Sequence, residues 1–268
     1  MKKFMRCAVW VATLTLLFGA AAANATTVTI GGGMGDWGIA NPNVGLNSLV
    51  PEAYNVAVTG TFGDIKYWEE SGVGPSGVVT PGSGGTPFDI RGLYFTQDTQ
   101  YFYFGAIVGI GPSGITSTDG RTYYISDIAL SFDGSTSGPK NGYEYGIKTL
   151  GTNNGKIYSV DGWNWNSPSG MVPHYSESSP AYLTSSTPAL GGGSSDFYYG
   201  TDSNIYYIEA RVLQSLFPST NGISFHLTES CGNDVGTLNV PVPEPGMMML
   251  LGSGLIGLAG WGRKKFRK

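Results

Sequence analysis

The chain has 268 residues, of which 42 are glycine and 13% are aromatic, and its formal net charge at pH 7 is −4. The aromatic residues are too frequent for a disordered chain, and the few basic residues exclude a nucleic-acid interface, which needs a positive patch. The charge is unevenly placed, because residues 26–241 hold seven Lys or Arg against eighteen Asp or Glu. That region, with a net charge of about −11, is compatible with calcium, with neutral glycans and with solubility outside the cell.

Residues 1–25 have the three parts of a secretory signal peptide, the kind of segment that the Sec translocon exports. An apolar centre at residues 8–18 is followed by a small-x-small cleavage site, in which Ala23 and Ala25 are the small residues. The mature protein is therefore expected to begin near Thr26. The charged start of the peptide contains Lys2, Lys3 and Arg6.

The chain has two cysteines, Cys7 and Cys231. Cys7 lies inside the predicted signal peptide and is lost on cleavage. Only one cysteine is then left in the exported region, which excludes an intrachain disulfide and leaves stability to the hydrophobic core.

Residues 26–241 form one exported domain, made of short runs rich in β-branched and aromatic residues and closed by Gly, Asn, Asp or Pro. Without helical crossovers, such runs predict an all-β fold, an antiparallel β-sandwich. The runs expected to be strands are residues 54–62, 90–96, 101–108, 127–132, 143–148, 156–160, 197–199, 205–212, 223–228 and 235–240.

Three other stretches of the domain are expected to have no strand. Residues 63–87 and 176–195 are rich in glycine, serine or proline, and we expect both to be long surface loops. Residues 213–217 can form a single helical turn, which Pro218 would end.

The last twenty-seven residues, Val242–Lys268, contain three features in a fixed order. Pro243 and Pro245 bracket Glu244 and interrupt regular structure. Residues 246–262 are uncharged and largely apolar, so a helix there is about long enough to span a bilayer core. The basic residues that would hold its end on the cytoplasmic side are Arg263, Lys264, Lys265, Arg267 and Lys268.

This tail resembles the PEP-CTERM protein-sorting signal of Gram-negative bacteria. The resemblance implies that an exosortase, a membrane enzyme similar to cysteine transpeptidases, recognises the segment Val242, Pro243, Glu244 and Pro245. It further implies an intermediate anchored in the inner membrane, then delivery to the cell surface or extracellular matrix. The alternative is an ordinary single-pass membrane anchor with prolines beside it by chance.

The exported domain is loosely similar to family 9-like carbohydrate-binding modules and their DOMON-like relatives. The similarity rests on the order of an Asp-Trp pair, an Asp turn before an aromatic strand, and an Ile-Glu strand before a short turn. It implies a jelly-roll or DOMON-like sandwich and does not carry over any sugar contact. The stretches concerned are Asp36-Trp37, residues 93–98, 101–104, 208–212 and 226–234.

Trp163 and Trp165 are the best candidates for contacting a ligand. Both indoles alternate with asparagines in a stretch bounded by Gly, Ser and Pro, which predicts a loop. Indoles in such a loop can stack on sugar rings while the amides bind hydroxyl groups. The alternative is that one or both tryptophans cover the core of the sandwich.

The sequence indicates no catalytic residue, no metal centre and no cofactor. His174 and His226 are isolated from each other and from any metal-binding motif, and His226 is expected in the core. A structural calcium ion is left open, because oxygen donors occur in predicted turns, where Asp and Asn are also ordinary turn residues. These donors are Asp133, Asp161, Asp202, Asn204, Asn233 and Asp234.

Together these features predict an exported, exosortase-processed protein that is not an enzyme. Its β-sandwich is expected to be a glycan-binding or structural module of the cell surface or of a biofilm matrix, with exopolysaccharide as a partner. The alternative is a secreted polysaccharide-active hydrolase on the same scaffold.

Overall fold

The computed structural model describes residues 28–39, 56–62, 65–71, 86–118, 120–133, 142–164, 182–186, 196–202, 205–217, 222–230 and 234–241. The predicted signal peptide (1–25) and sorting tail (242–268), including the expected membrane helix at 246–262, lie outside these residues. Within them, no helix is long and apolar enough to cross a membrane.

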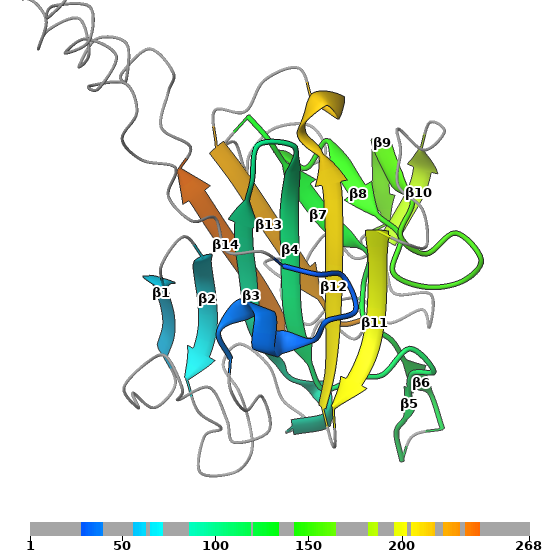
Figure 1. Cartoon of the computed structure of the whole chain (residues 1–268). Coiled ribbons are helices and arrows are strands. Elements are labelled where there is room, and N and C mark those ends of the chain that lie inside the picture. The colour runs from blue at the N-terminus through cyan, green and yellow to red at the C-terminus, as the bar shows by residue number, and fades with distance from the viewer. Residues whose placement is uncertain are drawn as a thin grey trace, which may run out of the picture.

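The described residues form two six-stranded antiparallel sheets, in the order β1-β2-β3-β4-β12-β11 and β10-β9-β8-β7-β13-β14, and a small β5-β6 hairpin (Figure 1). We call the two large sheets the first and the second sheet. The strands are β1 (Val56–Phe62), β2 (Ile65–Ser71), β3 (Ile90–Gln97), β4 (Tyr101–Val108), β5 (Ile115–Thr116), β6 (Thr122–Tyr123), β7 (Ile128–Ser131), β8 (Tyr145–Ile147), β9 (Ile157–Asn164), β10 (Tyr182–Ser186), β11 (Phe197–Asp202), β12 (Ile205–Leu213), β13 (Gly222–Thr228) and β14 (Val235–Pro241).

The main core lies between the two sheets, and strand β4 shows how the sequence builds it. Successive side chains of a strand point to opposite faces. Phe102, Phe104 and Ala106 accordingly join the central cluster, in which Phe104 meets Phe225 of β13 edge-on with ring centroids 5.3 Å apart. The predicted all-β fold of packed antiparallel sheets is therefore confirmed, while the finer jelly-roll or DOMON-like assignment stays a prediction.

The outer face of the first sheet is also apolar, and residues 28–39 cover part of it (Figure 1). This segment contains a 3-10 helix, Met34–Trp37. The Trp37 side chain is fully buried and lies over Gly105, where an added Cβ would approach the indole to 2.9 Å. The glycine in β4 thus makes room for the tryptophan.

The prediction that residues 63–87 and 176–195 are only loops is wrong for β2 and β10, which lie within them. β2 was obscured by its charged residues, Lys66, Glu69 and Glu70. Its Trp68 faces the core and its Ile65 and Tyr67 join the covered outer cluster, so both faces of the strand are partly buried. The predicted turn after β12 is confirmed as the 3-10 helix Gln214–Leu216.

Candidate functional site

Trp163 lies in strand β9, so the prediction of a loop at this residue is wrong. It is only 6% exposed, and its indole N–H donates a 2.9 Å hydrogen bond to the Tyr143 carbonyl oxygen. Its neighbours include Leu183, its cross-strand partner in β10. Trp163 therefore covers the outer face of the second sheet, while Trp165 lies outside the described residues.

Glu209 is a fully buried carboxylate that joins β12 to the N-terminal segment. Its Oε2 accepts a 2.7 Å hydrogen bond from the Gly31 amide, and its Oε1 accepts a 3.0 Å hydrogen bond from the Trp37 indole. Burial raises the pKa of this carboxyl group, and the hydrogen bonds from Trp37 and the backbone oppose that shift. Glu209 thus fixes the covering segment to the first sheet.

Asp127 plays a similar part in the second sheet. Its carboxylate accepts hydrogen bonds from the Thr149 amide at 3.1 Å and the Leu183 amide at 3.0 Å, and it forms a 2.7 Å ion pair with Lys148. Three segments (the end of β8, β10 and the residue before β7) therefore meet at one buried side chain.

Asp234 is one of the six candidate calcium donors, and its carboxylate binds backbone amides. It accepts a 2.6 Å hydrogen bond from Ile90 of β3 and a 2.7 Å hydrogen bond from Val235. Among the described residues, no group of three or more His, Cys, Asp or Glu is arranged to hold a metal ion. A structural calcium ion stays a prediction with no assigned ligands.

His226 lies on β13 and is 2% exposed, as expected for a core histidine. Its Nδ1 lies 2.9 Å from the Thr237 hydroxyl oxygen of β14, and its ring lies 5.2 Å from that of Tyr143. His174 lies outside the described residues.

Glu69 of β2 is the carboxyl group whose pKa is most informative. It is 2% exposed, and burial raises its pKa to about 7, against the opposing effect of a 2.7 Å hydrogen bond donated by the Tyr94 hydroxyl. Its second oxygen, Oε2, is buried without a hydrogen-bond partner in the structure. A carboxyl group of this kind carries its proton into the near-neutral range.

An open cavity of about 320 Å³ lies beside β11, the edge strand of the first sheet. We call it the β11 cleft. It is bordered by the β8–β9 turn and by the loop after β4. The lining residues are Pro112, Thr149, Leu150, Gly151, Asn154, Phe197, Tyr198 and Tyr199.

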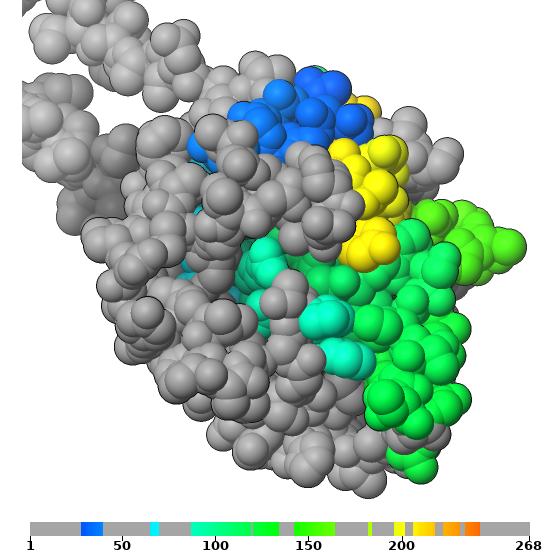
Figure 2. Space-filling view, turned by 90° about the horizontal axis from the view of Figure 1, so that it is seen from below, coloured from blue at the N-terminus to red at the C-terminus, as the bar shows by residue number. Residues whose placement is uncertain are grey.

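Polar contacts hold both sides of the β11 cleft in place. Asp127 binds the amide of Thr149 at the start of the β8–β9 turn. On the other side, the Tyr199 hydroxyl donates a 2.6 Å hydrogen bond to the Ile110 carbonyl oxygen, close to Pro112. Figure 2 shows from below the yellow β11–β12 end between the blue N-terminal segment and the green residues that follow β4.

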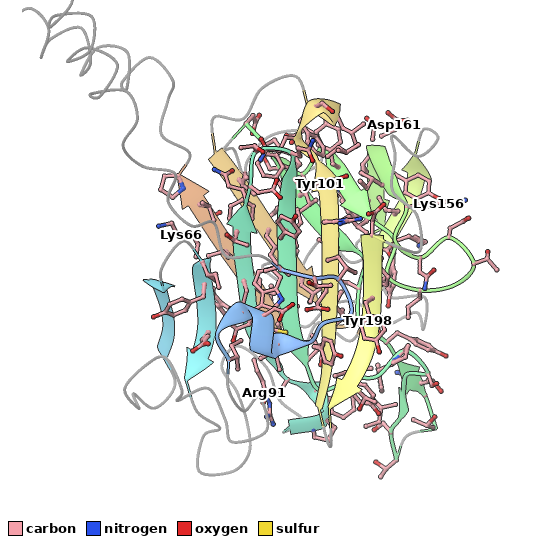
Figure 3. All side chains as sticks on the ribbon, in the orientation of Figure 1. Lys66, Arg91, Tyr101, Lys156, Asp161 and Tyr198 are labelled. Atoms are coloured by element: carbon pink, nitrogen blue, oxygen red, sulfur yellow. The ribbon has the colours of Figure 1, made fainter. Side chains whose placement is uncertain are left out.

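Tyr198 is 42% exposed, which makes it the most exposed large hydrophobic side chain among the described residues (labelled in Figure 3). The sequence indicates a strand at residues 197–199 and a turn at Asn154-Gly155, but no local pattern shows that the two meet. Their proximity follows from the pairing of the strands and from the packing of the sheets, so sequence reasoning missed this cleft.

Residues 241–264 match the family model described as the PEP-CTERM protein-sorting motif. No curated protein and no solved structure matches the chain. The match confirms the predicted sorting signal, including Pro243, Glu244 and Pro245. It supports an exosortase substrate that is exported and held at the membrane before cleavage, and it says nothing of the similarity to carbohydrate-binding modules, which stays a prediction.

Proposed function

We propose that this protein is delivered through its sorting motif to the cell surface or extracellular matrix of a Gram-negative bacterium, where the β-sandwich acts as a non-catalytic glycan-binding or structural module. The match of residues 241–264 to the sorting motif is the observation that carries this proposal. The Sec translocon and an exosortase are the proposed export partners, and exopolysaccharide is the proposed surface partner.

Each part of the tail has a physical role in the proposed sorting. The apolar residues 246–262 stop translocation in the bilayer, and the basic residues from Arg263 onward stay on the cytoplasmic side. The segment Pro243-Glu244-Pro245 then stands at the outer side of the membrane, between this helix and the folded domain. Two prolines keep it extended, which suits recognition by a processing enzyme.

The contacts of the buried carboxylates support a non-catalytic role. Glu209, Asp127 and Asp234 all accept hydrogen bonds from backbone amides, so their acceptor capacity is used in holding segments together. One observation favours a hydrolase instead: Glu69, with a pKa of about 7, has the protonation expected of a general acid. Its 2% exposure keeps it from a polysaccharide chain, which supports the non-catalytic proposal.

The sorting proposal is tested by the mass of the cell-associated and released protein. Pro243→Ala and Glu244→Ala are expected to leave the unprocessed precursor at the membrane, because both alter the proposed recognition segment. Met248→Leu is the matched control, since it preserves an apolar side chain in the expected helix. If all three variants are processed like the wild type, the segment is only an anchor.

The role of the domain is tested separately with exopolysaccharide purified from the producing cells. Sedimentation of the protein with the polysaccharide, without a change in polymer length, is expected for a binding module. Shortening of the polymer that disappears in Glu69→Gln would instead establish the hydrolase.

A further inference from the structure

We infer that the β11 cleft is a binding site for one or two sugar units of an uncharged saccharide. This inference rests on the proposed glycan-binding function and assigns it to a place other than the predicted Trp163 and Trp165. It follows from the shape of the cleft, the chemistry of its lining and the exposure of Tyr198.

The lining selects for a neutral ligand. All eight residues that border the cleft are uncharged, in an exported region whose net charge is about −11. An anionic sugar would meet no positive side chain there, and a cation would meet no carboxylate in the lining. The available groups are backbone amides and carbonyls, the Asn154 side-chain amide, hydroxyl groups and aromatic surface, which together suit sugar hydroxyls and the apolar face of a sugar ring.

The size of the cleft limits the ligand. A volume of about 320 Å³ lies at the lower end of the range for small-molecule sites, roughly 300–1,000 Å³. One or two sugar rings fit this space, whereas a longer chain would have to extend beyond it. The open form of the cleft allows a polymer to continue on either side of the bound unit.

The Tyr198 ring is held in place before any ligand arrives. It lies beside the ring of Tyr207, with centroids 5.7 Å apart and an interplanar angle of 39°. Gly200 leaves room for both rings, because an added Cβ there would collide with Tyr198 and approach Tyr207 to 2.8 Å. An aromatic side chain fixed in this way loses little conformational entropy on binding, which favours affinity.

The turn on the other side of the cleft is also fixed. Residues 148–156 are closed by backbone hydrogen bonds from Gly155 to Lys148 at 2.7 Å and from Asn154 to Gly151 at 3.3 Å. Gly151 and Gly155 have φ values of 82° and 78°, in the left-handed region that glycine adopts without strain. Asn154 is thereby presented at the exposed edge of the cleft.

The test uses the full chain in a detergent without a sugar headgroup and measures binding by calorimetry and saturation-transfer NMR. The probes are the neutral disaccharides cellobiose, maltose and di-N-acetylchitobiose, with galacturonate and glucosamine as charged comparisons. At least one neutral disaccharide is expected to bind saturably and more tightly than both charged sugars. Saturable binding of none of the neutral probes, or a preference for a charged sugar, would overturn the assignment.

Variants place the binding in the cleft. Tyr198→Ala is expected to weaken binding about tenfold, equivalent to about 1.4 kcal/mol, while Tyr198→Phe keeps the ring and stays within about twofold of wild type. Asn154→Ala, in an exposed turn, is expected to weaken binding severalfold. Leu213→Ala is the matched control, because Leu213 is 41% exposed at the far end of the neighbouring strand β12.

The outcomes separate this inference from the proposed function. If exopolysaccharide binds equally well to wild type, Tyr198→Ala and Asn154→Ala, the cleft is the wrong site but the glycan-binding function stands. If the wild type does not bind the polysaccharide at all, the glycan-binding function fails as well. Thermal unfolding of each variant identifies any loss of binding that results from loss of the fold.

Discussion

Replacing Glu69 by glutamine tests whether this buried carboxyl group destabilises the domain when it loses its proton. The glutamine side chain keeps an oxygen that can accept the hydrogen bond from Tyr94, and it mimics the neutral form of the acid. In the wild type, burial raises the pKa of Glu69 from 4.5 to about 7. The folded protein therefore keeps a proton that the unfolded chain releases between these two values.

The sign of the pH effect follows from this difference. The stabilising contribution of protonated Glu69 is complete below pH 4.5 and is lost as the pH rises to about 7. A shift of this size corresponds to about 3 kcal/mol at most, and partial water access reduces it to about 2 kcal/mol. Glu69→Gln is therefore expected to gain about 2 kcal/mol relative to wild type between pH 4 and pH 8.

Urea unfolding followed by tryptophan fluorescence at pH 4, 6 and 8 measures this gain. The comparison between variant and wild type at each pH removes the titration of the other acidic groups. Asp161→Asn, at an exposed position of β9, serves as a control for the loss of one negative charge. An equal difference between Glu69→Gln and wild type at pH 4 and pH 8 would refute the reasoning.

Two further substitutions test the structural contacts. Glu209→Ala is expected to lower the free energy of unfolding by about 3 kcal/mol, because the Gly31 amide and the Trp37 indole lose a buried charged acceptor; faster hydrogen exchange of the Trp37 indole is the accompanying readout, and unchanged exchange would contradict the role of Glu209. Trp163→Ala is expected to cost about 3–5 kcal/mol in unfolding and, under conditions where the domain stays folded, to leave saccharide affinity unchanged. Loss of affinity in folded Trp163→Ala would argue against the β11 cleft.

The strands could be predicted from the sequence where period-two alternation is strong. Residues 101–108 alternate between the central core and the outer face of the first sheet, as a strand with two covered faces requires. β2 could not be recognised in the same way, because Lys66, Glu69 and Glu70 make it read as polar. Its outer face is partly buried only because other segments of the chain lie on it.

The long-range contacts could not be predicted. Glu209 and Trp37 are 172 residues apart, and no local pattern indicates that one will accept a hydrogen bond from the other. Trp163 was misread for a related reason, since a tryptophan between glycine and asparagine resembles an exposed loop in sequence. Its burial follows from β10, a strand within a stretch whose composition predicts a loop. The sorting motif could be predicted, because all its features lie within one short segment.

The three buried carboxylates do in this domain what disulfides do in many exported proteins. Glu209 joins β12 to the N-terminal segment, Asp127 joins the residue before β7 to the β8–β9 turn and to β10, and Asp234 joins β14 of the second sheet to β3 of the first. A domain expected to keep a single cysteine after export needs such links from other chemistry.

The position of β14 shows how sorting and folding fit together. β14 is an edge strand of the second sheet and ends at Pro241, the residue at which the match to the sorting motif begins. Its ladder to β13 pairs Pro241 with Gly222 and Val235 with Thr228, so pairing extends to the last residue of the strand. Cleavage within Pro243-Glu244-Pro245 would therefore leave every described strand intact, and release from the membrane need not alter the fold.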